Sequence, residues 1–458
     1  MYEIDFNKPV HVFFVGIGGI SMSGLAEILH QAGFRVSGSD WKSSAITKGL
    51  EAKGIQVFYG ENAAHISDDI DCAVLTSAVK ESNAEFTAIR EKKIPYLSRA
   101  ELLGQLMKNY KTSIAISGTH GKTTTTSMVS EILLKADTDP TLSIGGILKT
   151  IGGNIRVGKS DYFVTEACEY TNSFLSFFPT VGLILNVEED HLDFFKDLAD
   201  IRNSFRKFAE LLPAEGCLII NADIPDYQEI TNGLPCKVIT YSTEHSADYT
   251  ANTIAYNELG CASFTAVTPT GEAQLSLKVP GLHNVSNALA ALALADYLAV
   301  DRTVTHDALF GFTGTDRRFE YKGTIGGVNI IDDYAHHPTE IAATLTAAKN
   351  YPHNTLWCVF QPHTYTRTKA FLDDFAKALS LADKVVLADI YAARETDTLG
   401  ISSEDLQAKI QALGCDATYL PSFDEIENFL LENCIKGDLL ITMGAGDVVK
   451  IGENLLGM

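Results

Sequence analysis

The chain has 458 residues, of which 46% are hydrophobic, and a formal net charge of −22. Its length allows two to four domains, and its negative charge argues against a diffuse nucleic-acid-binding surface, which would be basic. The first residues lack the basic and apolar regions expected of a signal peptide, no apolar run reaches the roughly 18 residues that span a membrane, and the eight cysteines contain no C-x-x-C pair. We therefore expect a cytoplasmic protein with free thiols and neither a nucleic-acid nor a membrane partner.

The first expected element group is a βαβ unit with a glycine-rich turn. An apolar strand over residues 10–15 is followed by the turn, a helix and a second strand that ends near Asp40. The turn reads Gly16-x-Gly18-x-x-Ser21, so serine stands where the dinucleotide fingerprint has its third glycine. Because Asp40 lies where a ribose-binding acid would lie, the residues alone leave an NAD site open.

The second group begins near Lys111 with a strand that feeds a phosphate-binding loop and a helix. Backbone N–H groups at such a helix start are unpaired and attract phosphate. The loop is shorter than G-x-x-x-x-G-K-[ST], but its lysine suits the β- and γ-phosphates and the threonine after it suits Mg²⁺. A plain glycine turn before a helix is the alternative. The expected nucleotide-binding residues here are Gly118, Thr119, His120, Gly121, Lys122, Thr123 and Thr124.

Two further strands of this group end in metal-binding side chains. A strand over residues 162–165 runs into Glu166 and Glu169, and the next strand leads to His191. The carboxyl ends of parallel strands converge on one ligand crevice. We therefore expect Thr123, Glu166 and His191 to hold a nucleotide-bound Mg²⁺, although the sequence does not decide between Glu166 and Glu169.

The remaining elements complete an α/β pattern. Residues 237–280 alternate apolar and polar side chains and predict antiparallel hairpins. An Ala/Leu-rich helix over residues 283–299 carries His283 and Asn287 on one face, where they either cap the helix or bind a ligand. After a Gly/Thr linker, four strands separated by helices predict a doubly wound, mostly parallel sheet. These strands are expected at residues 328–331, 356–360, 384–388 and 439–442.

Taken together, the motifs resemble the Mur ligases of peptidoglycan synthesis, and the resemblance covers the whole chain in order. The motifs that carry it are residues 118–124, Glu166, residues 189–191, residues 283–287 and Arg317. More narrowly, residues 16–25, 332–338, 361–367 and 391–395 are similar to the branch of that family that joins L-alanine to UDP-N-acetylmuramate. A sister branch that attaches a preformed peptide shares most motifs and stays an alternative, as do a nicotinamide dehydrogenase and a binding protein without activity.

The resemblance implies three domains. They are a Rossmann-like N-terminal domain for the UDP-sugar over residues 1–109, a central P-loop-type ATPase α/β domain with a small antiparallel part over residues 110–314, and a C-terminal Rossmann-like, doubly wound domain that receives the amino acid over residues 315–458. It further implies ATP and Mg²⁺ as cofactors, and UDP-N-acetylmuramate and L-alanine as substrates. The oligomeric state, monomer or dimer, stays open.

The resemblance also assigns the substrate-binding residues. The first glycine turn becomes the diphosphate site of the UDP-sugar, with Gly18, Gly19, Ser21, Met22, Asp40 and Ser77 around it. Thr364 stands where many members of the family have an arginine, so the carboxylate of alanine is expected to rest mainly on Arg367. Tyr334, His336 and His363 would orient the substrates.

The nucleotide and catalytic residues follow in the same way. His283 and Asn287 would hold adenine, and Arg317 and Asp332 would join the nucleotide site. A metal pair of His336 and His337 is not expected, because adjacent residues at a helix start diverge. No lysine is in register for the carbamylated lysine of several sister ligases. The expected catalytic residues are Lys122, His191, Arg317, His336, His363 and Arg367.

Overall fold

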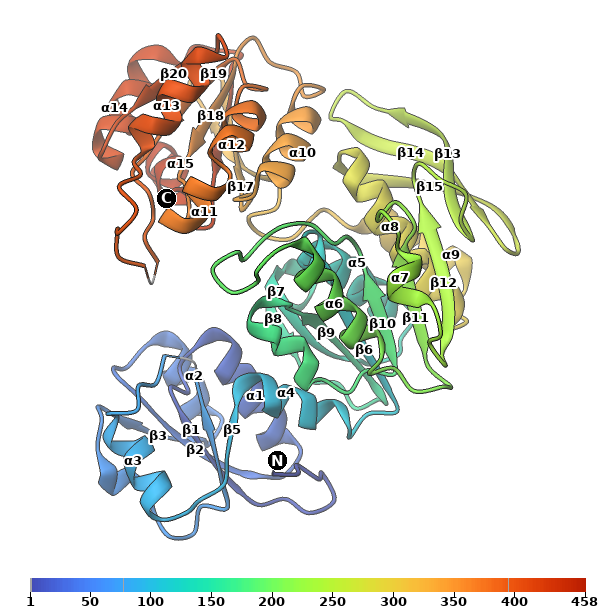
Figure 1. Cartoon of the computed structure of the whole chain (residues 1–458), viewed down its shortest axis with the longest axis vertical. Helices are drawn as coiled ribbons and strands as arrows, with labels where there is room; N and C mark the ends of the chain where they lie inside the picture. The colour runs from blue at the N-terminus through green and yellow to red at the C-terminus, as the bar shows by residue number, and fades with distance from the viewer. Residues whose placement is uncertain (1, 77, 394) are drawn as a thin grey trace.

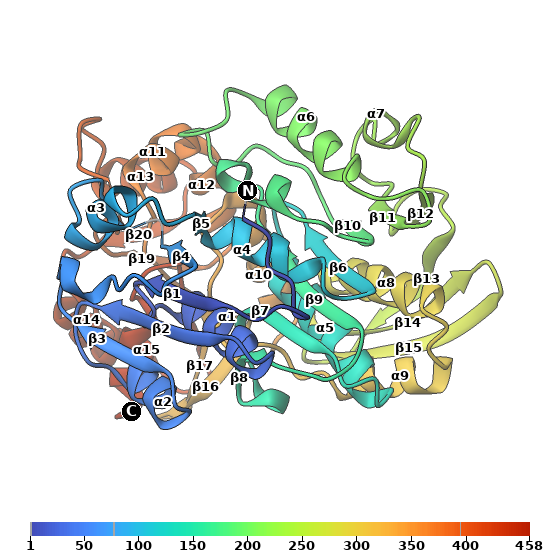
Figure 2. The ribbon, with the colours of Figure 1, turned by 90° about the horizontal axis from the view of Figure 1, so that it is seen from below.

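A computed structural model describes the chain over residues 2–76, 78–393 and 395–458. It contains three β-sheets with helices packed against them, which confirms the predicted α/β class with three sheet-containing units. Figures 1 and 2 together show the first and third units on the same side of the central one. Within the described residues, no helix is both long and apolar enough to cross a membrane.

The first sheet is wholly parallel, in the order β3-β2-β1-β4-β5. All five residues of β1 are buried, as expected of a strand covered on both faces. The strands are β1 (His11–Val15), β2 (Arg35–Asp40), β3 (Gln56–Tyr59), β4 (Cys72–Leu75) and β5 (Tyr96–Ser98). The helices are α1 (Ile20–Gln31), α2 (Ala45–Ala52), η1 (Ala63–His65), α3 (Ala84–Glu91) and α4 (Arg99–Met107).

The central sheet has ten strands in the order β15-β14-β13-β12-β11-β10-β6-β9-β7-β8. The strands are β6 (Thr112–Ser117), β7 (Thr141–Leu148), β8 (Gly153–Arg156), β9 (Tyr162–Ala167), β10 (Val181–Ile184), β11 (Cys217–Asn221), β12 (Lys237–Ser242), β13 (Tyr249–Tyr256), β14 (Cys261–Thr268) and β15 (Gly271–Pro280). The helices are α5 (Lys122–Lys135), η2 (Lys149–Ile151), η3 (Tyr170–Ser176), α6 (Leu198–Ala209), α7 (Gln228–Thr231), α8 (Leu282–Tyr297) and α9 (Arg302–Gly311).

One prediction for the central sheet is wrong in part. Residues 237–280 were expected to form antiparallel hairpins, but β12 pairs in parallel with β11. The antiparallel pairing runs from β13 through β14 to β15, and a tight turn between Thr268 and Gly271 joins the last two strands. Alternation of apolar and polar residues reports a half-buried strand and not the direction of its neighbour, so the pattern could not distinguish the two arrangements.

The third sheet has the order β16-β17-β21-β18-β19-β20 and is parallel except for the antiparallel edge strand β16. This agrees with the predicted doubly wound sheet. The strands are β16 (Glu320–Ile325), β17 (Val328–Asp333), β18 (Leu356–Phe360), β19 (Lys384–Leu387), β20 (Asp416–Tyr419) and β21 (Leu439–Met443). The helices are α10 (Pro338–Ala348), α11 (Tyr365–Ala370), α12 (Leu372–Leu379), α13 (Ser403–Ala412), α14 (Phe423–Asn433) and α15 (Val449–Leu456).

The apolar core links the first and central units. Leu25 and Leu103 of the first unit share one buried cluster with Phe163, Phe174 and Phe205 of the central unit. The third unit has buried clusters of its own on the two faces of its sheet. The eight cysteines are free thiols, five of them buried. The domain boundaries at residues 109 and 314 stay a prediction.

Candidate functional site

The phosphate loop joins β6 to α5 in the middle of the central sheet. Strand β6 lies between β10 and β9 and is parallel to both, so three strand ends meet here. Gly118 and Gly121 have φ angles of +144° and +80°. A Cβ atom on Gly118 would lie 2.9 Å from Cβ of Leu185, and one on Gly121 would lie 2.8 Å from Oδ1 of Asn287. Backbone conformation and close approach therefore both require glycine at these positions.

Asn186, which follows β10, holds the loop in place. The His120 N–H donates to Asn186 Oδ1 at 2.7 Å, and Asn186 Nδ2 donates to the His120 carbonyl at 3.1 Å. The Thr119 N–H donates to the Asn186 carbonyl at 3.2 Å. Helix α5 then begins at Lys122 without a side-chain cap. The first N–H groups of this helix therefore face a ligand site rather than a capping side chain.

Lys122 and Thr123 each face one of the two candidate glutamates. Lys122 Nζ lies 3.0 Å from Glu169 Oε2 and also donates to two loop carbonyls. The Thr123 hydroxyl donates to Glu166 Oε2 at 3.2 Å, and Glu166 Oε1 accepts from the Gly145 N–H. Burial alone would lower the pKa of Lys122, but nearby carboxylates, Glu169 first among them, raise that pKa above its ordinary value. The lysine is therefore a fixed positive charge.

His191 lies beside the second glutamate. Its Nε2 is 3.7 Å from Glu169 Oε1 and 3.7 Å from Asp190 Oδ2, and its ring lies against Tyr170 at 4.4 Å between centroids. Burial lowers the pKa of His191, so its imidazole is neutral near pH 7 and its nitrogen can bind a metal. Glu169 Oε1 is buried and accepts no hydrogen bond among the described residues. An oxygen of this kind is suited to a cation.

Most of the expected catalytic residues line two neighbouring cavities. One, of about 530 Å³, is lined by Lys122, Thr123, Glu166, His191, Arg317, Tyr334 and His336. The other, of about 280 Å³, is lined by His191, His363 and Arg367. His191 and Asp190 belong to both linings. The structure thus brings side chains from the central and third units to one place.

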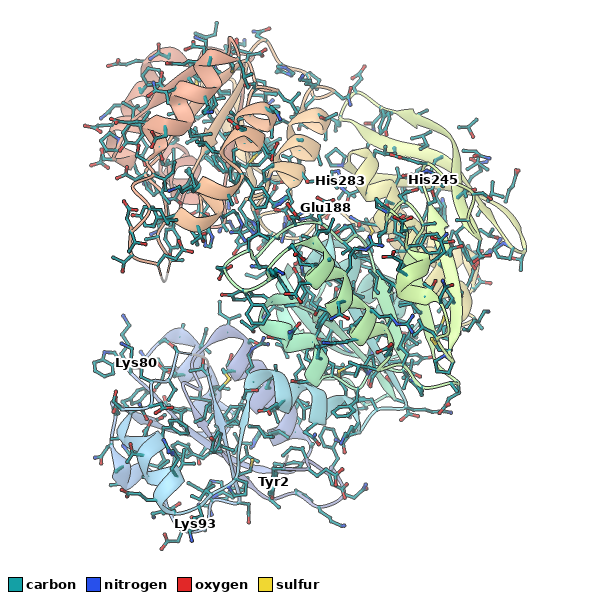
Figure 3. The ribbon with its side chains drawn as sticks, viewed as in Figure 1. Tyr2, Lys80, Lys93, Glu188, His245 and His283 are labelled. Carbon is teal, nitrogen blue, oxygen red and sulfur yellow. The ribbon has the colours of Figure 1, made fainter. Side chains whose placement is uncertain are left out.

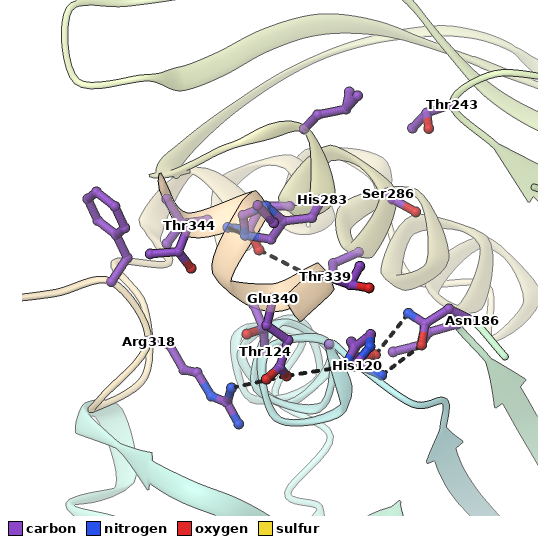
Figure 4. A pocket seen from close by; sticks show the side chains of 18 of the residues that line it. His120, Thr124, Asn186, Thr243, His283, Ser286, Arg318, Thr339, Glu340 and Thr344 are labelled. Atoms are coloured by element: carbon purple, nitrogen blue, oxygen red, sulfur yellow. Dashed lines mark hydrogen bonds and ion pairs between the residues drawn. The ribbon is translucent and has the colours of Figure 1, made fainter. Parts of the chain in front are cut away.

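The expected adenine-binding residues lie on the other side of the phosphate loop. His283 and Asn287 line a cavity of about 370 Å³ together with Gly121 and Thr124 (Figure 4). Asn287 Nδ2 donates to Asn284 Oδ1 at 3.1 Å, which fixes its amide. Figure 3 shows His283 on the side of the central unit that faces the third unit.

Arg317 and Asp332 meet, and the Asp332 side chain is fully covered. Arg317 Nε donates to Asp332 Oδ2 at 3.0 Å, and its two terminal nitrogens donate to the carbonyls of Gly446 and Gly444. Asp332 is 0% exposed and also accepts from the Thr442 hydroxyl. We correct the expectation that Asp332 binds nucleotide: its carboxylate is covered and orients Arg317.

Arg367 of the third unit forms an ion pair with Asp190 in the loop after β10. Arg367 donates from Nη2 and Nε to Asp190 Oδ1, at 2.9 and 3.1 Å, and Nη1 lies 3.2 Å from His363 Nδ1. The ring of His363 lies 5.9 Å from that of His336. His337 turns the other way, and its Nε2 donates to the Glu189 carbonyl at 2.9 Å. The divergence expected of His336 and His337 is therefore present.

His120, in the phosphate loop, lies between two carboxylates. Its Nε2 is 3.4 Å from Glu188 Oε2 and its Nδ1 is 3.4 Å from Glu340 Oε1 (Figure 4). Burial lowers the pKa of His120, but the two carboxylates outweigh it and raise the pKa to about 9. The sequence analysis missed Glu340, because an acidic residue in the first turn of a helix is ordinary there.

The glycine turn of the first unit lines a separate cavity of about 580 Å³. Gly18, Gly19 and Asp40 line it, and the Gly18 N–H donates to Asp40 Oδ2 at 2.8 Å. Trp41, which the sequence analysis did not single out, also lines it and is 76% exposed. Asp40 therefore stabilises the turn, and the aromatic ring of Trp41 is exposed beside the cavity.

Of the other three residues expected at this site, Ser21 and Met22 lie within the described part of the chain. The Ser21 hydroxyl accepts a hydrogen bond from Arg99 Nη1 at 3.1 Å. The side chain of Met22 is 2% exposed and belongs to the apolar core, so the predicted contact of Met22 with substrate is left to its backbone N–H and stays a prediction. Ser77 lies outside the described residues.

Comparison with known families matches all three units. The Mur ligase family, catalytic domain, matches residues 11–111; the Mur ligase middle domain matches residues 116–295; and the Mur ligase, glutamate ligase domain, matches residues 317–446. The chain belongs to the Mur ligase family.

Within that family, two of the similar proteins carry the same enzyme name. The chain is 61% identical over 459 residues to UDP-N-acetylmuramate–L-alanine ligase of Agathobacter rectalis and 59% identical over 458 residues to that of Lachnospira eligens, covering 100% of both sequences in each case. Among solved structures, UDP-N-acetylmuramate-alanine ligase of Thermotoga maritima has a TM-score of 0.80 at 30% identity over 98% of each chain. A murein peptide ligase of Psychrobacter arcticus has a TM-score of 0.70 at 26% identity, also over 98% of each chain.

Proposed function

We propose that this chain joins L-alanine to the lactyl carboxylate of UDP-N-acetylmuramate, using ATP and Mg²⁺, in the synthesis of a peptidoglycan precursor. The proposal is carried by one observation: side chains of the phosphate loop and side chains of the third unit line adjoining cavities that meet at His191. Phosphate-loop groups line one side of the adjoining cavities, and His336, His363 and Arg367 line the other. The whole-length identity of 61% to a ligase of that name supports the same reaction.

The donor groups beside the phosphate loop fit Mg²⁺. Thr123 offers a hydroxyl, Glu166 offers a half-buried carboxylate and Glu169 a buried one, and Glu169 Oε1 has no hydrogen-bond donor among the described residues. Hard oxygen ligands of this kind suit Mg²⁺, and the neutral His191 can complete the set. When bound, the ion would offset the negative charge that develops during phosphoryl transfer.

The phosphoryl step would take place at the phosphate loop. An oxygen of the lactyl carboxylate attacks the γ-phosphorus, the bond to the β–γ bridging oxygen breaks, and ADP leaves. Lys122 is already charged beside the loop, so its positive charge can stabilise the phosphates once an ammonium N–H turns from a loop carbonyl to a phosphate oxygen. The product is an acyl phosphate. Packing of the third unit against the phosphate loop would shield it from water.

The amide would form on the side of the third unit. The amine nitrogen of alanine attacks the acyl carbon, the bond to phosphate breaks, and the amine loses a proton. Burial lowers the pKa of His336 to about 4, so its imidazole is neutral near pH 7. His336 Nδ1 lies 3.0 Å from the Tyr334 carbonyl, to which it donates, leaving Nε2 as the nitrogen that accepts this proton. Arg367 and His363 would position the amino acid.

Phosphate release with different acceptors tests the proposal. Purified protein with UDP-N-acetylmuramate, Mg²⁺ and ATP should release phosphate when L-alanine is added and much less with a tripeptide. A preference for the tripeptide would instead assign the chain to the sister activity, that of the 26% identical murein peptide ligase. Release that does not depend on the UDP-sugar would refute both.

A further inference from the structure

Glu340 contacts three basic side chains that come from three different segments. It lies in the first turn of α10, and its side chain is 14% exposed. Its Oε1 is 3.4 Å from His120 Nδ1 and 3.9 Å from Arg318 Nη1. Its Oε2 is 3.4 Å from His336 Nδ1 and accepts from the His336 N–H at 3.1 Å. Figure 4 shows Glu340 between His120 and Arg318.

The two oxygens of Glu340 therefore serve two different functional groups. Oε1 faces the phosphate loop of the central unit, and Oε2 accepts from the backbone N–H of His336 and lies beside its ring, which lines the cavity shared with the third unit. A buried carboxylate is unfavourable unless it is paired, so Glu340 is held wherever its basic partners lie. Because a carboxylate is planar and rigid, the position of His120 and the orientation of His336 depend on each other.

Neighbouring contacts show that this link exists only with the third unit docked. Thr339, beside Glu340, donates its hydroxyl to Glu188 Oε2 at 2.6 Å, and His337 donates to the Glu189 carbonyl. His120 and His337 also pack ring on ring at 4.6 Å between centroids. The first turn of α10 thus forms the contact between the third unit and the phosphate loop.

We propose that Glu340 is a positioning residue that couples docking of the third unit on the phosphate loop to the orientation of His336. This inference rests on the proposed ligase function and deepens it. Acyl transfer to the amino acid then proceeds at full rate only when His120 engages one oxygen of Glu340. Substrate binding in the first unit does not depend on this contact.

Replacing Glu340 with glutamine tests the proposal, because glutamine keeps the shape and removes the charge. We expect Glu340→Gln to lower kcat for the complete reaction by up to about 100-fold, the size of effect that a small misplacement of a reacting group produces. KM for UDP-N-acetylmuramate should stay within about twofold of the wild type. A thermal melt of each variant confirms that it is folded. An unchanged kcat in folded Glu340→Gln would overturn the proposal.

Glu188→Gln is the matched control. Glu188 contacts the opposite nitrogen of His120 and the Thr339 hydroxyl but does not contact His336, so its loss disturbs the docking contact without the His336 side and should lower kcat distinctly less. Equal effects of the two variants would show that the His336 side of Glu340 contributes nothing, and would overturn the proposal.

A double-mutant cycle with His120→Gln tests whether Glu340 acts through His120. The double variant should have nearly the kcat of Glu340→Gln alone, since residues that act as one unit are not additive. Independent, multiplying effects would contradict the coupling. If the wild type releases no phosphate with UDP-N-acetylmuramate and L-alanine, the proposed function fails. If the wild type is active and Glu340→Gln is equally active, only the positioning role fails.

Discussion

Arg367 of α11 and Asp190 of the loop after β10 form a buried ion pair between the third and central units. Nη2 and Nε of Arg367 lie 2.9 and 3.1 Å from Asp190 Oδ1, and the two side chains are only 8% and 7% exposed. Burial would raise the pKa of Asp190, but Arg367, with help from nearby histidines, holds it well below its usual range. The arginine expected to bind alanine is thus already paired with a protein carboxylate.

Breaking this pair should loosen the third unit. In Asp190→Asn, Arg367 stays buried without its counter-charge, and removing one partner of a buried pair typically costs about 3–5 kcal/mol. We expect a larger radius of gyration in solution X-ray scattering and a lower kcat/KM for L-alanine. Wild-type scattering and wild-type kinetics in this variant would show that the pair does not hold the units together.

Mg²⁺ dependence should distinguish the two glutamates of the central unit. Both oxygens of Glu166 already accept protein hydrogen bonds, whereas Oε1 of Glu169 accepts none among the described residues. We expect Glu169→Gln to raise the Mg²⁺ concentration for half-maximal phosphate release by at least about tenfold, as loss of a charged metal ligand or its support does. Glu166→Gln is the matched variant, and a larger effect there would assign the ligand to Glu166.

The phosphate loop is the part of the site that could be predicted from the sequence. Its two glycines, Lys122 and Thr123 form a local pattern, and the structure gives them the strand-loop-helix setting that the pattern predicts. The strand ends around them also converged as expected, because parallel sheets bring carboxyl ends together.

Contacts between distant segments could not be predicted. Asp190 and Arg367 are separated by 177 positions, and their pairing depends on how two units dock. The burial of the Met22 and Asp332 side chains likewise depends on what packs over them, which the motifs that contain them do not report. The importance of Glu340 could not be predicted from the sequence, because the role proposed for it depends on partners in three segments.

The protonation of His120 gives a pH dependence. Its pKa of about 9 in the folded protein exceeds the ordinary 6.5, so its contribution is complete below about pH 6.5 and is lost as the pH rises through 9. Glu188, Glu340 and the ring of His337 face it. A shift of this size corresponds to about 3 kcal/mol.

Thermal stability measured between pH 6 and 9.5 tests this dependence. The wild type should lose stability across that window relative to His120→Gln, which has no proton to lose. Parallel curves for the two proteins would mean that folding does not raise the pKa of His120.

Trp41 should report on binding in the first unit. The chain has two tryptophans, and Trp357 is 2% exposed with its indole N–H bonded to Asp438, so a fluorescence change on adding UDP should come from Trp41. Stacking of a base on an aromatic ring contributes about 1–3 kcal/mol. We expect Trp41→Ala to weaken UDP binding roughly 5- to 150-fold and Trp41→Phe to preserve it. Tyr96→Ala, which removes another exposed aromatic side chain of the same unit, is the control. Full quenching by UDP in Trp41→Phe would exclude Trp41 as the reporter.

The fate of the carboxylate oxygen tests the central claim most directly. UDP-N-acetylmuramate labelled with ¹⁸O in its lactyl carboxylate is incubated with the protein, Mg²⁺, ATP and L-alanine, and the released phosphate is analysed by mass spectrometry. An acyl phosphate transfers one carboxylate oxygen to phosphate, so each amide formed should yield one phosphate with a single ¹⁸O. Unlabelled phosphate released together with the amide would contradict activation of the carboxylate by phosphorylation.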